Sequence, residues 1–250
     1  MKDNIKVLVV IPAFNEGKTI RDVLMRLKKV IEKIVYELNV EMRPLVIDDG
    51  STDDTPEVVR SCGVTLIKHE KNMGPGAAVR TGLIYAIKNG FDVVVQMDAD
   101  GQHLPEEIPK LLIPILRGKA DVVIGSRFLG TTCYNMPLLR KLGIKFYSII
   151  AFLVTGRMIL DITSGFRAYG IKAVKFIAHA YPIDFPAIKS TLMLVRRGFR
   201  VIEIPTKMME RKRGRSYIGG LNLIRYHIRA LKSLIELMVW DRHNSALSNM

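Results

Sequence analysis

The sequence predicts an α/β protein with a mostly parallel central sheet that helices cover on both faces. Short runs rich in valine and isoleucine alternate with amphipathic segments of helical length through the first half of the chain. A continuous apolar run is typical of a strand buried on both faces, and parallel strands need a crossover between them. Several of these runs end in polar residues, at the edge where such sheets bind ligands.

The expected elements follow one another in a regular order. Strands are expected at residues 7–11, 44–47, 64–68, 93–97 and 122–125, and helices at residues 18–36, 55–61, 75–88 and 105–117. Asp53 and Asp54 are candidate caps of the second helix, and Pro105 suits the first turn of the fourth. Beyond residue 125 the pattern changes to amphipathic helices at 138–155 and 221–240, with a strand at 200–204.

The composition is that of a globular protein, with 48% hydrophobic and 25% charged residues among 250. Its 2 cysteines do not form a disulfide framework, so a reducing, cytosolic location is expected. The longest uncharged apolar run, residues 146–156, is too short to cross a bilayer, which takes about 20 residues. No transmembrane helix and no secretory signal are therefore expected.

Positive charge is concentrated late in the chain. Residues 189–232 hold twelve Lys or Arg and two acidic residues, so they carry +10 of the formal net charge of +14. Such a region favours an anionic partner, which is a nucleic acid, a lipid headgroup surface or a phosphorylated substrate. Aromatic residues make up only 7%, and no nucleic-acid-binding motif is present, so we expect no nucleic-acid partner.

Two acidic residues follow the fourth expected strand. Asp98 and Asp100 would project the same way if the backbone stays extended, and their repulsion favours a cation between them. Oxygen ligands with open positions suit Mg²⁺ or Mn²⁺ shared with a substrate diphosphate, and Gln102 and His103 could add ligands. The alternative is a solvated acidic turn that caps the next helix.

Two further segments have both a functional and a structural interpretation. The acidic run at 48–53 either hydrogen-bonds a base or ribose, or forms an Asx turn and a helix cap. The basic run at 211–216 either clamps phosphates or is a solvated loop. The glycines at 74–76 do not match a dinucleotide fingerprint, because Val79 stands at the third glycine position.

Taken together, the motifs resemble glycosyltransferase family 2. The resemblance rests on the segments at 12–16, 48–53, 72–74 and 98–103. The segments at 125–127 and 161–167, with Arg211, Gly214 and Ser216, make the chain similar to polyprenyl-phosphate glycosyltransferases of the dolichol-phosphate mannose synthase type. The similarity extends from about residue 7 to 218.

This resemblance implies a GT-A fold for residues 1–218, with an interface helix within 137–160 and a C-terminal amphipathic helix and tail at 219–250. It implies a GDP- or UDP-linked sugar donor and a Mg²⁺ or Mn²⁺ ion. The implied metal ligands are Asp98, Asp100 and Gln102, and the implied catalytic residues are Asp100, Arg127 and Arg211. The implied substrate-binding residues are Pro12, Phe14, Glu16, Asp48, Asp49, Ala99, Arg167 and Ser216, with Arg127, Arg167 and Arg211 on phosphates.

The expected reaction is metal-dependent, inverting transfer of a hexose to a polyprenyl or dolichyl phosphate. A phosphate monoester is mostly a dianion at pH 7, so it needs no general base, whereas a hydroxyl acceptor does. The basic and amphipathic segments imply a peripheral position on an anionic membrane surface, at the cytoplasmic face.

The sequence also departs from the family pattern. Relatives often carry an acidic residue in the helix before the strand at 200–204. Where glutamates are expected this chain has Ala187 and Lys189, and only Asp184 is acidic there. Two alternatives therefore stay open: transfer to a saccharide hydroxyl with Asp184 as the base, and nucleotide-sugar binding without transfer.

Overall fold

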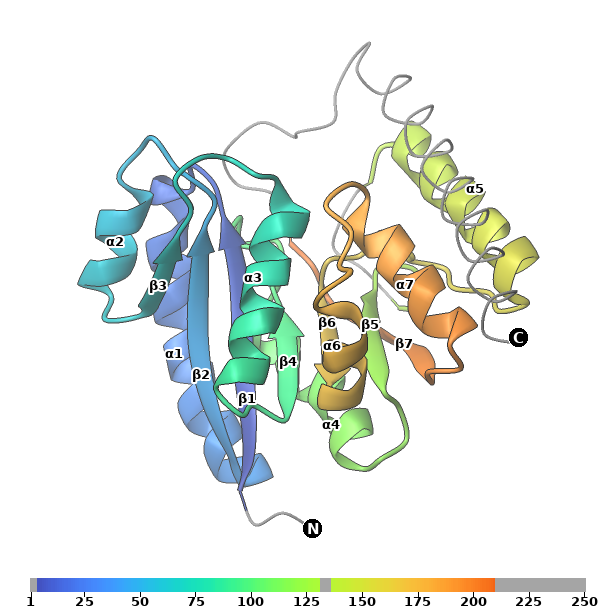
Figure 1. Cartoon of the computed structure of the whole chain (residues 1–250), viewed down its shortest axis with the longest axis horizontal. Coiled ribbons are helices and arrows are strands. Elements are labelled where there is room, and N and C mark those ends of the chain that lie inside the picture. The colour runs from blue at the N-terminus through green and yellow to red at the C-terminus, as the bar shows by residue number, and fades with distance from the viewer. Residues whose placement is uncertain (1–3, 131–135, 210–250) are drawn as a thin grey trace.

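The computed structural model describes residues 4–130 and 136–209. Seven strands form one sheet in the order β3-β2-β1-β4-β6-β5-β7 (Figure 1). The strands are β1 (Ile5–Ala13), β2 (Val40–Asp48), β3 (Thr65–Lys68), β4 (Val93–Gln96), β5 (Val122–Ser126), β6 (Arg167–Gly170) and β7 (Val201–Pro205). The helices are α1 (Gly17–Leu38), α2 (Thr55–Ser61), α3 (Pro75–Lys88), the 3₁₀ turn η1 (Pro105–Glu107), α4 (Ile108–Leu116), α5 (Leu138–Thr155), α6 (Ile171–Ile177) and α7 (Pro186–Arg196). Every pairing is parallel except the two made by β6, so the predicted α/β fold with a mostly parallel sheet is confirmed.

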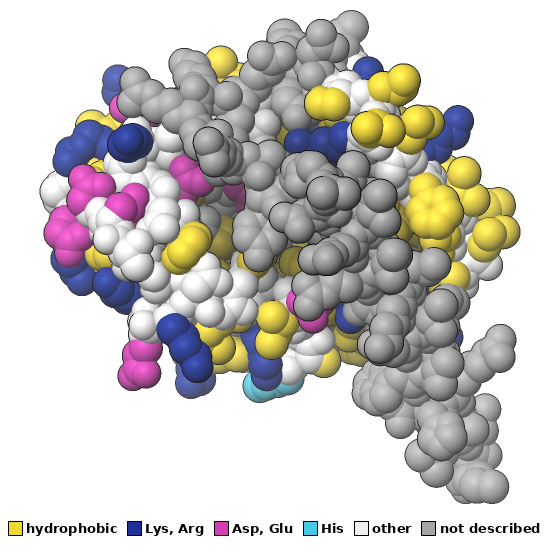
Figure 2. All heavy atoms as spheres, turned by 90° about the horizontal axis from the view of Figure 1, so that it is seen from above, with side chains coloured by type: hydrophobic (Ala, Val, Ile, Leu, Met, Phe, Trp, Pro, Cys, Tyr) yellow, Lys and Arg dark blue, Asp and Glu magenta, His cyan; other side chains and the backbone are white. Residues whose placement is uncertain are grey.

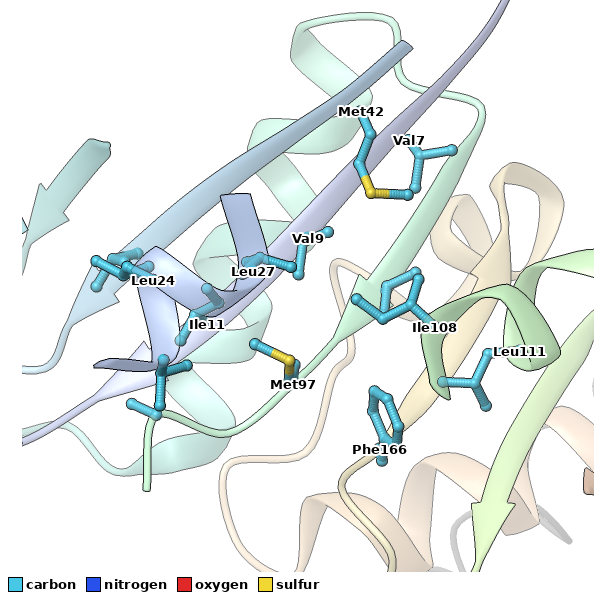
Figure 3. Packing of buried hydrophobic residues seen from close by; sticks show 14 of the residues in the cluster. Val7, Val9, Ile11, Leu24, Leu27, Met42, Met97, Ile108, Leu111 and Phe166 are labelled. Carbon is cyan, nitrogen blue, oxygen red and sulfur yellow. The ribbon is translucent and has the colours of Figure 1, made fainter. Parts of the chain in front are cut away.

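Both faces of the sheet are covered, because side chains of successive strand residues point in opposite directions. In β1, Val7, Val9 and Ile11 pack with α1, α2 and α4, whereas Leu8 and Val10 pack with α3, α6 and α7. Figure 3 shows part of the first core, which continues beneath the carboxyl edge of the sheet to the buried Met97 and Phe166. The strand ends that carry polar residues therefore stand on a packed core.

Most of the expected helices and strands are present at the residues that the local sequence pattern predicts. The helices α2, α3 and α5 begin and end at the expected residues, and the fourth expected helix starts as η1 before α4. Asp54 occupies the N-cap position of α2 without a side-chain cap bond, whereas Asp53 accepts hydrogen bonds from Gly17 N–H and Thr55 N–H. The antiparallel strand β6 was not expected, because its four residues contain no apolar run and begin with arginine.

Helix α5 lies outside the layer that covers the sheet and packs on α7 (Figure 1). Its buried residues are Ile144, Tyr147, Ser148 and Ala151. Four residues of its apolar stripe, Leu142, Phe146, Ile149 and Leu153, are exposed by 44–76%. Within the described residues, no helix is both long enough and apolar enough to span a bilayer. The expected helix at 221–240 lies outside the described residues.

Candidate active site

The carboxyl ends of the parallel strands meet at one edge of the sheet, where a polar pocket of about 70 Å³ opens. The segments that form it come from five places in the sequence. Its lining residues are Asp98, Gln102, His103, Arg127, Arg140, Thr163, Ser164, Gly165 and Met208. The pocket thus brings the acidic segment after β4 to the arginine after β5, as expected, and adds the loop before β6.

Asp98 is held in position through its backbone and offers its carboxylate to the pocket. The Asp98 N–H donates to His103 Nδ1 at 2.9 Å, and the imidazole stacks on Phe166 with ring centres 4.9 Å apart. His103 is buried, whereas the Asp98 side chain is 42% exposed. Because Nδ1 accepts from the backbone, this nitrogen of His103 supports Asp98 and is not available as a metal ligand.

The backbone turns between Asp98 and Asp100. The chain leaves β4 at Gln96 and turns at Ala99 and Asp100, so the expectation of extended backbone through Asp100 is wrong. The Asp100 Oδ1 accepts the Gln102 N–H at 3.0 Å, and Asp100 is not among the residues that line the pocket. Ala99 is buried beneath the turn.

The residues of the pocket fit a divalent ion that is shared with a substrate. Asp98 supplies a carboxylate and Gln102 an amide oxygen to the same pocket. No group of three or more His, Cys, Asp and Glu side chains that could hold a metal occurs among the described residues. Mg²⁺ is commonly bound by one or two carboxylates together with substrate phosphates and water, which matches this sparse set.

Arg127 is locked in place by a buried carboxylate. Its Nε and Nη2 donate to the two oxygens of Asp161 at 2.7 and 2.6 Å, and its backbone N–H donates to the same carboxylate. Asp161 is fully buried, and Glu203 accepts the N–H groups of Leu160 and Asp161. This bidentate pairing fixes the guanidinium plane at the pocket wall.

Arg140, in the first turn of α5, lines the same pocket and was missed by sequence reasoning. The sequence signal that could have indicated it is a basic residue in the first turn of a helix whose apolar stripe faces away from the core. Only the fold shows that this turn reaches the strand ends. The pocket therefore has one carboxylate and two guanidinium groups.

The expected nucleoside residues lie at the ends of β1 and β2. Pro12 and Glu16 are half-buried, and Phe14 is 42% exposed. Asp48 is fully buried: its Oδ1 accepts the Ser51 N–H, and its Oδ2 has no hydrogen-bond partner within the described ranges.

The carboxylate of Asp49 is engaged in hydrogen bonds within the protein. Its carboxylate accepts the N–H groups of Met73 and Gly74 at 3.0 and 2.7 Å. Its Oδ1 also lies 2.7 Å from Nδ1 of His69, whose Nε2 is 2.9 Å from the Thr81 hydroxyl oxygen. Asp49 therefore ties the loop before α3 to the end of β2.

Arg167, which the resemblance implies as a phosphate contact, lies in a structural environment. It is 1% exposed, and its guanidinium donates to Ile162 O, Ser164 O and the hydroxyls of Ser190 and Thr191. It thus binds the loop before β6 to α7 and offers no surface to a phosphate. Arg211 and Ser216 lie outside the described residues.

Solved structures share this architecture. Glucosyl-3-phosphoglycerate synthase from Mycobacterium tuberculosis, in complex with Mn²⁺, UDP and glucosyl-3-phosphoglycerate, is similar with a TM-score of 0.69 and 22% identity, over 93% of this chain and 80% of that one. At this identity the likeness concerns the fold, which is that of the GT-A glycosyltransferases.

The chain belongs to glycosyl transferase family 2, whose sequence model matches residues 8–177. It is 32% identical to a UDP-N-acetylglucosamine–dolichyl-phosphate N-acetylglucosaminyltransferase of Methanococcus voltae, over 80% of this chain and 84% of the relative. It is also 32% identical to polyprenol monophosphomannose synthase of Mycolicibacterium smegmatis, over 87% of this chain and 83% of the relative. The resemblance found in the sequence is therefore confirmed, and the chain is a glycosyltransferase.

Proposed function

We propose that this protein transfers a hexose from a GDP- or UDP-linked sugar to a polyprenyl or dolichyl phosphate, with inversion at the sugar carbon and with Mg²⁺ or Mn²⁺. The observation that carries the proposal is the pocket that Asp98 and Gln102 line together with Arg127 and Arg140. Asp98 and Gln102 suit a metal-bound diphosphate, and the two arginines suit a second phosphate.

The donor half is supported by the candidate metal ligands and by the strand ends beside them. A divalent ion, when bound, neutralises the diphosphate leaving group. Asp98 and Gln102 would hold this ion, and His103 keeps Asp98 in place through its backbone. UDP accompanies Mn²⁺ in the similar synthase structure, which supports the same pairing of ligands here.

The acceptor half is supported by the two arginines and by α5. Arg140 is in the first turn of the helix whose apolar stripe is exposed, so a lipid on that stripe has its phosphate near the pocket. Figure 2 looks onto the carboxyl edge of the strands and shows hydrophobic side chains gathered on the α5 side, with Lys and Arg beside them. Relatives are named for dolichyl-phosphate and polyprenol acceptors, which agrees with this arrangement.

The chemistry requires positioning more than proton transfer. An oxygen of the acceptor phosphate attacks the anomeric carbon of the sugar from the face opposite the diphosphate. The bond from that carbon to the diphosphate oxygen breaks, and the nucleoside diphosphate leaves with the electron pair. Because the acceptor is already a dianion, no side chain takes a proton, and arginines reduce the repulsion between the two anions.

A panel of labelled donors and short polyprenyl phosphates with Mg²⁺ or Mn²⁺ tests the proposal. We expect transfer to the phosphate and no loss with Asp184→Asn, because Asp184 is exposed and does not line the pocket. Transfer to a saccharide hydroxyl that Asp184→Asn abolishes would contradict the proposal. Donor binding with no product from any acceptor would instead indicate a non-catalytic binding protein.

We also propose that α5 holds the protein peripherally on the cytoplasmic face of an anionic membrane. Its exposed stripe is flanked by Arg140, Lys141 and Lys145, and a basic residue near an anionic leaflet contributes about 1 kcal/mol. Sedimentation with anionic vesicles should decrease in high salt and with Phe146→Ser. Equal sedimentation with neutral vesicles, unaffected by salt, would contradict this interpretation.

A further inference from the structure

The buried Arg167 hydrogen-bonds two backbone carbonyl groups of the loop from Asp161 to Gly165. Arg167 Nε donates to Ser164 O at 2.6 Å, and Nη2 donates to Ile162 O at 2.8 Å. One edge of a single buried guanidinium therefore draws two carbonyl groups of the loop inward. Its Nη1 is held at 2.8 Å by the Thr191 hydroxyl, so the guanidinium is anchored to α7.

Peptide geometry fixes what the other side of this loop presents. In a trans peptide the N–H of one residue points opposite to the C=O of the residue before it, and no cis peptide bond occurs in the described residues. The Thr163 N–H and the Gly165 N–H therefore point away from Arg167. Both residues line the pocket, and neither N–H has a hydrogen-bond partner in the described part of the chain.

Ser164, which lies between Thr163 and Gly165, differs from them in the partner of its backbone N–H. The Ser164 N–H donates to Asp161 O at 3.1 Å, inside the loop. The Thr163 hydroxyl accepts from Arg127 Nη2 at 3.0 Å, so the loop also contacts the arginine of the pocket wall. The two backbone donors thus line the pocket together with the guanidinium group that contacts their loop.

We propose that the Thr163 and Gly165 N–H groups form a cradle for a phosphate oxyanion, and that Arg167 is the positioning residue that holds it open. Backbone N–H groups aimed at one concavity are a common way of binding anions. The inference rests on the proposed function and adds a subsite to it. It also explains why a buried arginine is needed where no phosphate can reach.

Charge supports the same assignment. Arg127 is paired with Asp161, whereas Arg167 has no carboxylate partner among the described residues and hydrogen-bonds only carbonyls and hydroxyls. A buried cation without a counter-ion is unfavourable unless an anion binds nearby. The thin loop between Arg167 and the pocket leaves the positive potential directed at the cradle.

Two substrate groups have the chemistry that the cradle recognises: the diphosphate of the donor and the monophosphate of the acceptor. They are distinguished by following the backbone amide signals of Thr163 and Gly165 by NMR. One sample is titrated with UDP or GDP and Mg²⁺, and a second with citronellyl phosphate. We expect both amide protons to move downfield with one of these ligands and the Ser164 amide to move much less.

Replacement of single residues by their α-hydroxy acids gives a functional test, because it removes one N–H and keeps the side chain. At Thr163 or at Gly165 we expect the dissociation constant of the responsive ligand to rise about tenfold, as for a lost hydrogen bond to a charged group. The same replacement at Ser164 is the matched control and should leave the dissociation constant within about twofold, although it weakens the loop. Arg167→Lys keeps a charge but cannot bracket two carbonyls, so it should weaken binding of the same ligand.

The outcomes separate the cradle from the proposed function. Transfer to polyprenyl phosphate with silent Thr163 and Gly165 amides, and with equal effects of all three replacements, would overturn the cradle and leave the function standing. Amides that respond to UDP or GDP in a protein that transfers to no acceptor would support the cradle and overturn the function.

Discussion

Asp49 and Asp98 follow the two strands that flank β1 in the sheet, and their environments are opposite. Asp49 follows β2 and is 3% exposed, and its carboxylate accepts two backbone N–H groups and contacts His69. Asp98 follows β4, and its side chain is 42% exposed to the pocket. At the end of β2 the next loop folds back and hydrogen-bonds the carboxylate, whereas at the end of β4 His103 holds the backbone and the carboxylate lines the pocket. The same sequence signal therefore gives a structural carboxylate in one place and, in the function that we propose, a metal ligand in the other.

Replacing Asp98 by Asn should give the largest effect on activity. We expect the transfer rate to fall by about 10³-fold, because the metal-bound diphosphate loses its charged ligand. The free energy of unfolding should stay within about 0.5 kcal/mol of the parent, since the side chain is open to water. A variant that keeps full activity at saturating Mn²⁺ would show that Asp98 is not a metal ligand.

The matched change, Asp49→Ala, should act on stability. It leaves the Met73 N–H without its acceptor and the Gly74 N–H with only Asn72 Oδ1, so we expect a loss of about 2 kcal/mol in the free energy of unfolding. Urea denaturation followed by circular dichroism measures this loss. If Asp49→Ala is as stable as the parent but does not bind nucleotide, Asp49 belongs with Asp98 as a ligand-facing residue.

Arg140 tests whether the open side of the site extends to α5. Arg140→Gln should raise the KM for the polyprenyl phosphate by about tenfold and leave the KM for the sugar donor unchanged, as for one lost charge-assisted hydrogen bond. Lys141→Gln is the control, because Lys141 is exposed and does not line the pocket. Equal effects of the two variants on this KM would show that Arg140 acts only as one of several surface charges.

The smallest effect is expected at the opposite edge of the sheet. Arg200 hydrogen-bonds Asp121 just before β5 and, together with its charge, holds the pKa of that carboxyl below its usual range. Asp121→Asn should therefore cost at most about 1 kcal/mol at neutral pH, because the pair is partly exposed.

The pH dependence of this pair has a defined sign. A lowered pKa in the folded protein stabilises it above the unfolded value of about 3.9, and the advantage is lost as the pH falls through the folded value. The parent and Asp121→Asn should then have similar stabilities in strong acid. A gap that widens below pH 4 would contradict this assignment.

The sequence predicted those parts of the fold that local patterns determine. Runs such as Val93–Gln96 and the spacing within α1 and α5 identify strands and helices without tertiary information. Strand β6 was missed because its identity depends on two neighbours that are far away in the sequence. Tertiary pairing, not propensity, makes this segment a strand.

The sequence predicted where in the fold the candidate site lies better than it predicted the contacts that its residues make. The strand-end rule placed Asp98 and Arg127 at one edge, and the structure brings them into one pocket. The turn at Asp100 and the burial of Arg167 depend on where backbone N–H and C=O groups find partners, which residue spacing does not record. The place of Arg140 in the pocket could be predicted only with knowledge of how α5 packs on α7.

The position of β6 has a consequence for how the molecule is made. β1, β2 and β3 have all their described strand partners within the first 96 residues, whereas β4 and β5 both pair with β6, which is synthesised later. On the ribosome β4 and β5 therefore wait for β6; β5 waits for about forty further residues, and loops of that length close slowly. A chain that stops short of residue 167 lacks the strand that joins β4 to β5, so the two parts of the sheet stay unconnected.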